Sequence, residues 1–199
     1  YDSRRCPWSV DLLWESLDGC RRVSWGLLGW AFWMKLDQLL ADIDVVSRSG
    51  DVRVEVTGVQ YDSRRVEPGS VFVAIQGEQS DGNDFVDQAI ERGAVAFVSE
   101  SDVTGSAPWV RVRSDRSALA ALAGTYFDRP TNQLRLVGIT GTNGKTTTAH
   151  LVESIIEAAG YRVASFGTTD HRGPGFRRAA KLTTPEAPDL EQMFRSTVD

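Results

Sequence analysis

The chain has 199 residues, of which 41% are hydrophobic and 25% charged, and its formal net charge is −5 with a pI near 5.1. This composition is typical of a soluble globular protein, and the acidic balance argues against a surface that binds nucleic acid. No apolar run approaches the ~20 residues that a membrane-spanning helix needs. Cys6 and Cys20 suggest neither a disulfide framework nor a metal-ligand cluster. We expect a cytoplasmic monomer without membrane or nucleic-acid partners.

The first 33 residues differ in composition from the rest of the chain. They contain five of the six tryptophans and both cysteines. The apolar patch 25–33 follows two arginines, but no small-residue cleavage site of a secretory signal comes after it. Met34 opens a segment that is typical of the start of a soluble protein. We therefore interpret residues 1–33 as a non-native or disordered extension; the alternative is a genuine N-terminal extension.

Residues 34–130 alternate short apolar runs with amphipathic segments, which predicts an α/β fold. Ser114 is a suitable N-cap for the last of the helices and Asn83 for the middle one, with Gly93 just past the end of the latter. A polar, glycine-containing loop over 76–83 follows an expected strand. Residues 128–132 break the pattern, and we place a domain boundary there. The expected helices cover 36–43, 84–92 and 115–127, and the expected strands cover 52–56, 70–75, 94–98 and 109–112.

The most informative motif lies at residues 136–148, where an apolar run ends in a turn bracketed by glycines. An expected strand over 134–140, the loop 141–146 and an expected helix over 147–159 follow each other in the order of a phosphate-binding loop. Glycines free backbone N–H groups, and a helix N-terminus attracts an anion. Lys145 is placed to reach the terminal phosphates, and the Thr146 hydroxyl to meet a magnesium ion. The loop is shorter than the common G-x-x-x-x-G-K-[ST] pattern, so an ordinary turn that caps a core helix is the alternative.

After this loop the pattern predicts a second, incomplete α/β unit over 131–199. Gly160 is a suitable end for its first helix. A strand over 161–166 and a basic loop over 171–178 follow, and we expect Arg172, Arg177 and Arg178 to be solvated rather than to bind an anion. A final helix begins at Pro185 and runs toward Val198. These elements are too few to cover both faces of a parallel sheet, so we expect the chain to stop inside this domain.

The segment Gly141-Thr-Asn-Gly-Lys-Thr146 resembles the nucleotide loop of the Mur ligase family, the ATP-dependent amide-forming enzymes of peptidoglycan assembly. Residues 62–74, 89–96 and 183–190 are similar, in that order, to the family member that adds a diamino acid, usually meso-diaminopimelate or lysine, to UDP-N-acetylmuramoyl-L-alanyl-D-glutamate. The resemblance runs almost continuously from Met34 to Asp199. It implies a small mixed α/β domain that binds the UDP-muramoyl substrate (34–130) and the start of a parallel-sheet P-loop ATPase domain (131–199) in a bacterial enzyme of cell-wall biogenesis.

The same resemblance implies roles for individual residues. Lys145 would act on the β and γ oxygens of ATP, and Thr146 would hold Mg²⁺. Ser63, with Tyr61 beside it, would bind the uridine end of the substrate. The other implied residues are Gly141, Thr142, Asn143, Gly144 and Thr147 on the ATP phosphates, Glu78, Gln79 and Ser80 on the nucleotide-sugar, and Thr183 and Thr184 on the muramoyl-peptide side.

Each of these residues also has a structural interpretation. Ser63 is a common turn residue, and Thr184 is a suitable N-cap with Pro185 at the first helical position. Residues 78–80 could be a solvated loop. Asp62 and Arg64 could form a surface pair worth only ~0–1 kcal/mol. His150 has no paired ligand nearby in the sequence, and we expect it to be structural.

The implied reaction joins a carboxylate to an amine. Phosphoryl transfer from ATP makes an acyl phosphate, the amine attacks, and phosphate leaves. Such a transfer needs alignment and charge neutralisation, which Lys145 and magnesium near Thr146 would supply in part. The family also uses a carbamylated lysine, further magnesium ligands and a C-terminal domain that lie outside these residues. We therefore expect the chain to be an N-terminal fragment without ligase activity of its own.

Two other functions stay open on the sequence. The first is another Mur ligase or a folylpolyglutamate-type ligase that shares the loop, which residues 62–64 and 183–185 disfavour. The second is a non-catalytic module that binds a nucleotide or a UDP-sugar. The residues that select the added amino acid lie outside the chain, so the sequence does not identify that amino acid.

Overall fold

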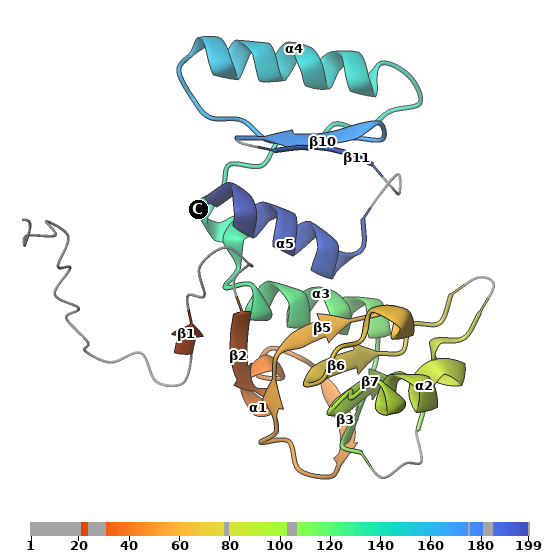
Figure 1. Cartoon of the computed structure of the whole chain (residues 1–199). Coiled ribbons are helices and arrows are strands. Elements are labelled where there is room, and N and C mark those ends of the chain that lie inside the picture. The colour runs from red at the N-terminus through yellow and green to blue at the C-terminus, as the bar shows by residue number, and fades with distance from the viewer. Residues whose placement is uncertain are drawn as a thin grey trace, which may run out of the picture.

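The computed structural model describes residues 21–23, 31–77, 80–102, 107–174, 176–180 and 185–198. Helix α5 (Ala187–Val198) lies between two groups of elements (Figure 1). On one side is a first unit built around a five-stranded sheet. On the other side are a small sheet and the long helix α4 (Lys145–Ala158). No helix among the described residues is long and apolar enough to cross a membrane.

The five-stranded sheet is the centre of the first unit. Its strand order is β3-β8-β7-β6-β5, in which β8 to β5 are parallel and β3 joins the edge antiparallel to β8. The parallel part confirms the prediction of strands that alternate with helices. The expected strands near 70–75, 94–98 and 109–112 are all present. The bounds are β3 Val45–Ser49, β5 Gly58–Gln60, β6 Ser70–Val73, β7 Ala96–Ser99 and β8 Trp109–Val112.

Both faces of this sheet are covered. Val71 and Val73 of β6 belong to a core cluster shared with α1 (Leu36–Leu39) and α3 (Asp115–Tyr126). Phe72 belongs to a second cluster shared with α2 (Val86–Glu91). Because successive residues of a strand point to opposite faces, a central strand with both faces covered is apolar throughout, as β6 is after Ser70.

The helix ends of the first unit show where local sequence signals were sufficient. The Ser114 hydroxyl accepts a hydrogen bond from the Ser117 N–H at 3.3 Å, so the predicted cap of α3 is confirmed. Gly93 follows α2 with a φ of +96°, as expected for a residue past a helix end. Asn83 is not a cap. The Asp81 carboxylate accepts from the Asn83 N–H at 2.9 Å and caps a 3₁₀ turn, η2 (Gly82–Phe85), so α2 begins two residues later than predicted.

A second, antiparallel sheet in the first unit has the order β1-β2-β4, with bounds Arg21–Val23, Ala31–Lys35 and Glu55–Val56. The strand predicted over 52–56 is therefore only two residues long, although its burial alternates as expected. The helix predicted over 36–43 is the four-residue α1. Strands β3 and β5 were not predicted, because neither has a clear two-residue period.

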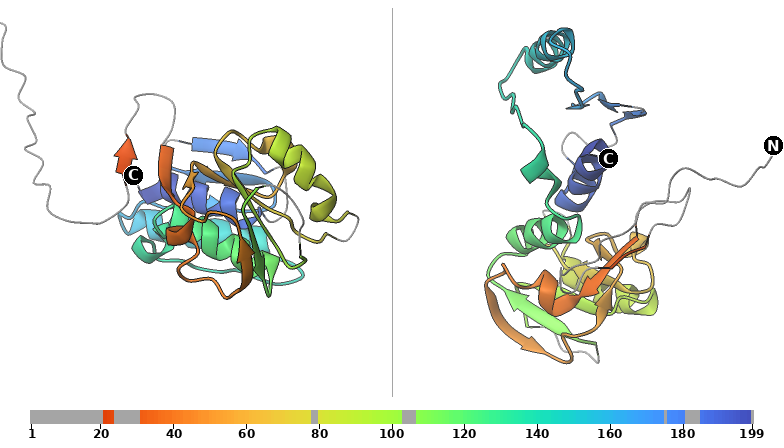
Figure 2. Two further views of the ribbon diagram at one scale, coloured as in Figure 1. Left: turned by 90° about the horizontal axis from the view of Figure 1, so that it is seen from below. Right: turned by 90° about the vertical axis from the view of Figure 1, so that its left-hand side faces the viewer.

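The second group of elements departs most from the sequence prediction. The segment 134–140 forms no strand, and the three strands described here, β9 (Ser165–Phe166), β10 (Asp170–Gly173) and β11 (Phe176–Ala179), pair antiparallel. The expected basic loop is thus a hairpin. Figure 2 shows the segment before α4 running alone, without a neighbouring strand. A strand needs a neighbouring strand for its N–H and C=O groups, and no described strand pairs with this segment.

Helix α5 returns to the first unit and packs on α3 and on the 3₁₀ turn η3 (Pro130–Gln133). It begins at Ala187 rather than at Pro185, and Pro188 lies in its first turn. The predicted cap Thr184 lies outside the described residues. Between α3 and η3 the chain turns through two residues of positive φ, Asp128 at 60° and Arg129 at 43°, which is where the sequence predicted a domain boundary.

Candidate functional site

The loop before α4 has the backbone of an anion-binding turn. Gly144 is the N-cap of α4 and has a φ of +78°, and Gly141 has a φ of +151°. A side chain at Gly144 would meet no atom within 4 Å, so the backbone angle rather than lack of space calls for glycine there. Both glycines of the predicted motif therefore have a local conformational reason.

Lys145 closes this loop. Its ammonium Nζ donates to the Gly141 carbonyl at 2.6 Å, across the turn. No residue in the described part of the chain accepts a hydrogen bond from the backbone N–H groups of Lys145, Thr146 and Thr147, which open the helix. A cation and free N–H donors thus lie together on an exposed loop. This is the arrangement that binds phosphate oxygens.

The predicted metal ligand of this loop, the Thr146 hydroxyl, is exposed, and Thr142 and Asn143 are the other exposed side chains of the loop that carry an oxygen. Among the described residues no group of three or more His, Cys, Asp or Glu side chains could hold a metal ion. Magnesium is commonly held by one or two protein oxygens together with nucleotide phosphates and water. The residues present therefore fit a nucleotide-bound magnesium ion rather than a metal held by protein alone.

The proposed substrate residues of the first unit lie on a short 3₁₀ turn, η1 (Ser63–Arg65), and just before it. The Ser63 side chain is buried, and its hydroxyl donates to Gln88 Oε1 at 2.5 Å. Tyr61 donates from its phenol to Asp189 of α5 at 2.7 Å. Both polar groups therefore have partners within the chain.

Asp62 shapes this turn. Its carboxylate accepts from the Arg64 backbone N–H at 3.0 Å and from the Arg64 guanidinium at 2.9 and 2.8 Å. The predicted pair is confirmed, and these hydrogen bonds lower the pKa of Asp62. Because Arg64 is exposed, the pair orders the turn more than it stabilises the fold.

The other predicted residues are less informative. Ser80 is exposed, and its carbonyl accepts from the Gly77 N–H at 2.9 Å. Glu78, Gln79, Thr183 and Thr184 lie outside the described residues. The phosphate loop begins α4, on the far side of the β9–β11 sheet from α5 (Figure 1), whereas Tyr61 meets α5 directly. Sequence reasoning missed Asp189, because nothing local marks an aspartate in the first turn of a helix as the partner of a distant tyrosine.

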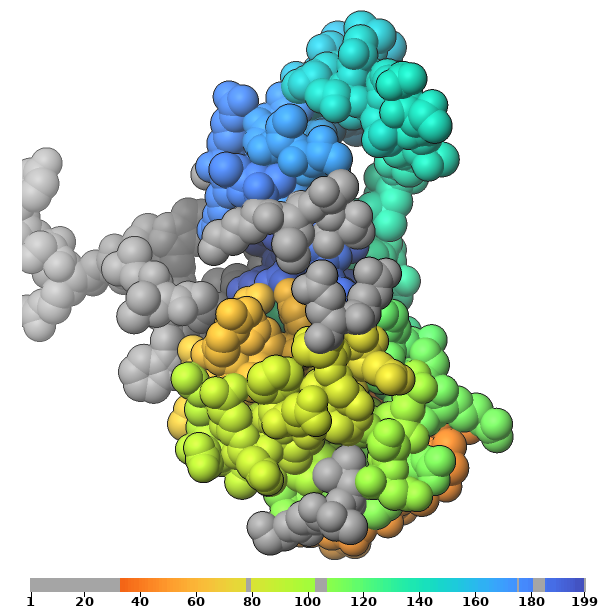
Figure 3. All heavy atoms as spheres, turned by 90° about the vertical axis from the view of Figure 1, so that its right-hand side faces the viewer, coloured from red at the N-terminus to blue at the C-terminus, as the bar shows by residue number. Residues whose placement is uncertain are grey.

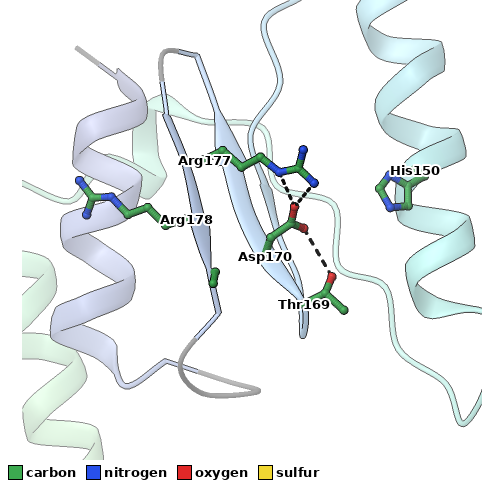
Figure 4. Close-up of a pocket in the computed structure, with 6 residues that line it drawn as sticks. His150, Thr169, Asp170, Arg177 and Arg178 are labelled. Atoms are coloured by element: carbon green, nitrogen blue, oxygen red, sulfur yellow. Dashed lines mark hydrogen bonds and ion pairs between the residues drawn. The ribbon is translucent and has the colours of Figure 1, made fainter.

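A pocket of about 340 Å³ lies between α4 and the β10–β11 hairpin. Arg177 turns toward Asp170 there and forms an ion pair at 2.9 Å, while Arg178 points away from it (Figure 4). His150 enters from α4, with its Nδ1 3.1 Å from Arg172 Nη2. Arg172 in turn binds Glu153 at 2.8 Å. Arg172 and Arg177 are thus paired with carboxylates, and His150 lies within this network.

Comparison with known proteins finds a family match for each of the two units. Residues 55–126 match the Mur ligase family, catalytic domain, and residues 139–199 match the Mur ligase middle domain. The UDP-N-acetylmuramoyl-L-alanyl-D-glutamate--2,6-diaminopimelate ligase of Alkaliphilus metalliredigens is 41% identical over 168 residues, which are 83% of this chain and 34% of that protein. The ligase of the same name from Solibacter usitatus is 49% identical over 144 residues, 71% of this chain and 29% of that protein.

Solved structures of Mur ligases are also similar to this chain. A structure of a ligase of the same name superposes with a TM-score of 0.65 at 25% identity, covering 83% of this chain and 33% of that one. The MurF structure from Acinetobacter baumannii has a TM-score of 0.56 at 21% identity with the same coverage, which shows a shared fold. The chain spans about a third of the length of the curated relatives that it matches. With two domains of one family matched along its length and relatives above 40% identity, the chain belongs to the Mur ligase family.

Proposed function

We propose that this chain supplies the UDP-muramoyl-substrate domain (34–130) and the beginning of the ATP-binding domain (131–199) of a ligase that adds diaminopimelate to UDP-N-acetylmuramoyl-L-alanyl-D-glutamate. The names of the relatives and their identity of 41–49% support this substrate. The complete reaction belongs to peptidoglycan synthesis in the bacterial cytoplasm. Within it, this chain binds and orients two of the reactants.

The observation that carries the proposal is the geometry around Lys145. Its ammonium donates to the Gly141 carbonyl across a turn whose following N–H groups have no acceptor among the described residues, so a nucleotide phosphate would meet donors that are already oriented. In the proposed complex the ammonium exchanges the neutral carbonyl for phosphate oxygens, a stronger, charge-assisted partner. Gly141, Thr142, Asn143 and Gly144 supply the backbone of this cradle.

Magnesium would be held at the Thr146 hydroxyl together with the phosphates. ATP bound there would supply the phosphoryl group that activates a carboxylate for attack by an amine. The chain's own part is to hold the phosphates still and to neutralise their charge, with Lys145 and the helix N-terminus as the positive groups. Thr147 belongs to the same first turn.

The proposed binding residues for the uridine end of the substrate belong to the first unit. Tyr61 and Ser63 lie on one turn and would meet the uridine end, and residues 78–80 would contact the same nucleotide-sugar. Thr183 and Thr184, which directly precede the α5 region, would bind the muramoyl-peptide. In this arrangement α5 joins the two binding regions, because it follows residues 183–184 in the chain and contacts Tyr61.

The test is nucleotide binding to this chain. We expect Mg·ATP to bind, measured by equilibrium dialysis, and Lys145→Ala to bind it at least about tenfold more weakly through loss of a charge-assisted contact. Lys35→Ala is the matched control, because it removes the same charge from an exposed position in the first unit. Equal affinity of the Lys145→Ala variant and the parent would overturn the proposal.

A further inference from the structure

Helix α5 and the residue before it carry two carboxylates that meet cations of the first unit. Glu186 pairs with Arg116 at 3.0 Å, and Asp189 pairs with Arg65 at 2.8 Å. Ala187, at the start of the helix, packs against the main core of the first unit. These contacts fix the first turn of α5 on the side of the first unit that carries η1.

Asp189 differs from Glu186 in what its two oxygens do. Oδ2 accepts from the Tyr61 phenol at 2.7 Å, and Oδ1 accepts from Arg65 Nη1 at 2.8 Å. Both oxygens of the Glu186 carboxylate, by contrast, accept from Arg116 Nη1, at 3.0 and 3.3 Å. The side chain of Asp189 is only 19% exposed. One carboxylate thus spans two residues that flank Ser63, one on each side.

This arrangement fixes the direction of Tyr61. Its ring packs against the core, and its only O–H is directed at Asp189, so the phenol oxygen is left with acceptor capacity toward any other group. Burial first, and then the hydrogen bond and charge of Asp189, raise the pKa of Tyr61. Arg65 adds an opposing charge and Glu186 a reinforcing one, so the phenol stays protonated at neutral pH.

We propose that Asp189 is a positioning residue for the substrate site: by binding Tyr61 and Arg65 together it holds the uridine-binding turn in register with the helix that follows residues 183–184. This inference rests on the proposed function, since it takes Tyr61 and Ser63 to be substrate residues. Its consequence is that a residue of the second unit sets substrate affinity in the first without touching the substrate.

The test is titration of the chain with UDP-N-acetylmuramoyl-L-alanyl-D-glutamate by isothermal calorimetry. We expect Asp189→Ala to bind about tenfold more weakly, the loss typical of one charge-assisted hydrogen bond. Asp189→Glu, which keeps the carboxylate, should recover part of the affinity. Glu186→Gln is the matched control, because it breaks the ion pair with Arg116 and keeps the hydrogen bond between Tyr61 and Asp189.

A double-mutant cycle shows whether Asp189 acts by orienting Tyr61 or only by holding α5 on the first unit. If Asp189 acts through Tyr61, then Asp189→Ala should weaken binding much less in a Tyr61→Phe background than in the parent. Additive effects, an unchanged affinity of Asp189→Ala, or an equal loss in Glu186→Gln would each overturn the inference and leave the proposed function standing. Failure of the parent chain to bind the UDP-substrate would overturn the proposed function itself.

Discussion

The first unit and the region around α4 respond differently to similar sequence patterns. In the first unit an apolar run, Ser70–Val73, becomes the buried strand β6 between two parallel neighbours. The apolar run before α4 remains exposed, with Leu136 at 58% and Val137 at 64%. In Figure 3 the cyan residues of α4 stand at the end of the molecule farthest from the first unit. The same contrast holds for helices, because α3 buries one whole face whereas α4 has no buried residue.

This difference shows that an apolar run is a strand only where other strands accept its hydrogen bonds. The helix α4 forms all the same, since its hydrogen bonds are internal and its start is set by Gly144. The loop 141–144, between the apolar run and α4, likewise depends on local backbone angles at its two glycines. The part of the chain proposed to bind phosphate is therefore independent of the packing that shapes the first unit, and the following changes test that contrast.

The largest expected effect comes from a matched pair of leucines. Leu122 of α3 is fully buried, so Leu122→Ala should lower the free energy of unfolding by about 2–5 kcal/mol. Leu151 of α4 is 61% exposed, so Leu151→Ala should change it by less than about 0.5 kcal/mol. Urea unfolding followed by far-ultraviolet circular dichroism measures both. Similar losses in the two variants would contradict the difference in packing between the regions.

A smaller effect is expected at the start of α3. Ser114→Ala removes the hydroxyl that accepts from the Ser117 N–H and should destabilise the first unit by about 1 kcal/mol. Ser114→Asp keeps an acceptor and should stay within a few tenths of the parent. The same urea series measures both variants. Equal destabilisation by Ala and Asp would show that the cap hydrogen bond is not the cause.

The contact between Tyr61 and α5 predicts a pH dependence. Tyr61→Phe should destabilise by about 1 kcal/mol at pH 7, through loss of the O–H that Asp189 accepts. Because the pKa of Tyr61 is raised in the folded state, this contribution is complete below the ordinary tyrosine pKa near 10 and is lost as the pH rises above it. The difference between parent and variant should therefore shrink above about pH 10. A constant difference from pH 7 to 11 would contradict this assignment.

The smallest effect is expected for the exposed Asp62–Arg64 pair. Asp62→Asn keeps an oxygen for the Arg64 N–H and removes the charge, and should cost less than about 0.5 kcal/mol. The lowered pKa of Asp62 means that its contribution is present above the ordinary carboxyl pKa and is lost as the pH falls. Added salt should reduce the effect further. A loss above 1 kcal/mol in high salt would show that the turn is more than a surface pair.

Local signals predicted much of the site and part of the fold. The glycines of the phosphate loop, the Ser114 cap and the end of α2 at Gly93 each depend on the backbone of a few neighbouring residues, and each is present. The strands β6 and β7 were predicted because a strand covered on both faces is nearly all apolar, and β8 was predicted although it contains Arg111. The short edge strands β3 and β5 carry no such pattern and were missed.

The amino-acid sequence by itself determined the glycine turn before α4, the strands β6, β7 and β8 of the first unit, and the family to which the chain belongs. Only the tertiary structure decided that residues 134–140 stay unpaired, that the basic segment 171–178 is a hairpin, and that Asp189 binds Tyr61. The physical reason is the separation along the chain of the residues that interact. Backbone angles and caps are set within one turn of chain, whereas strand pairing and a hydrogen bond between residues 128 positions apart depend on segments that only folding brings together.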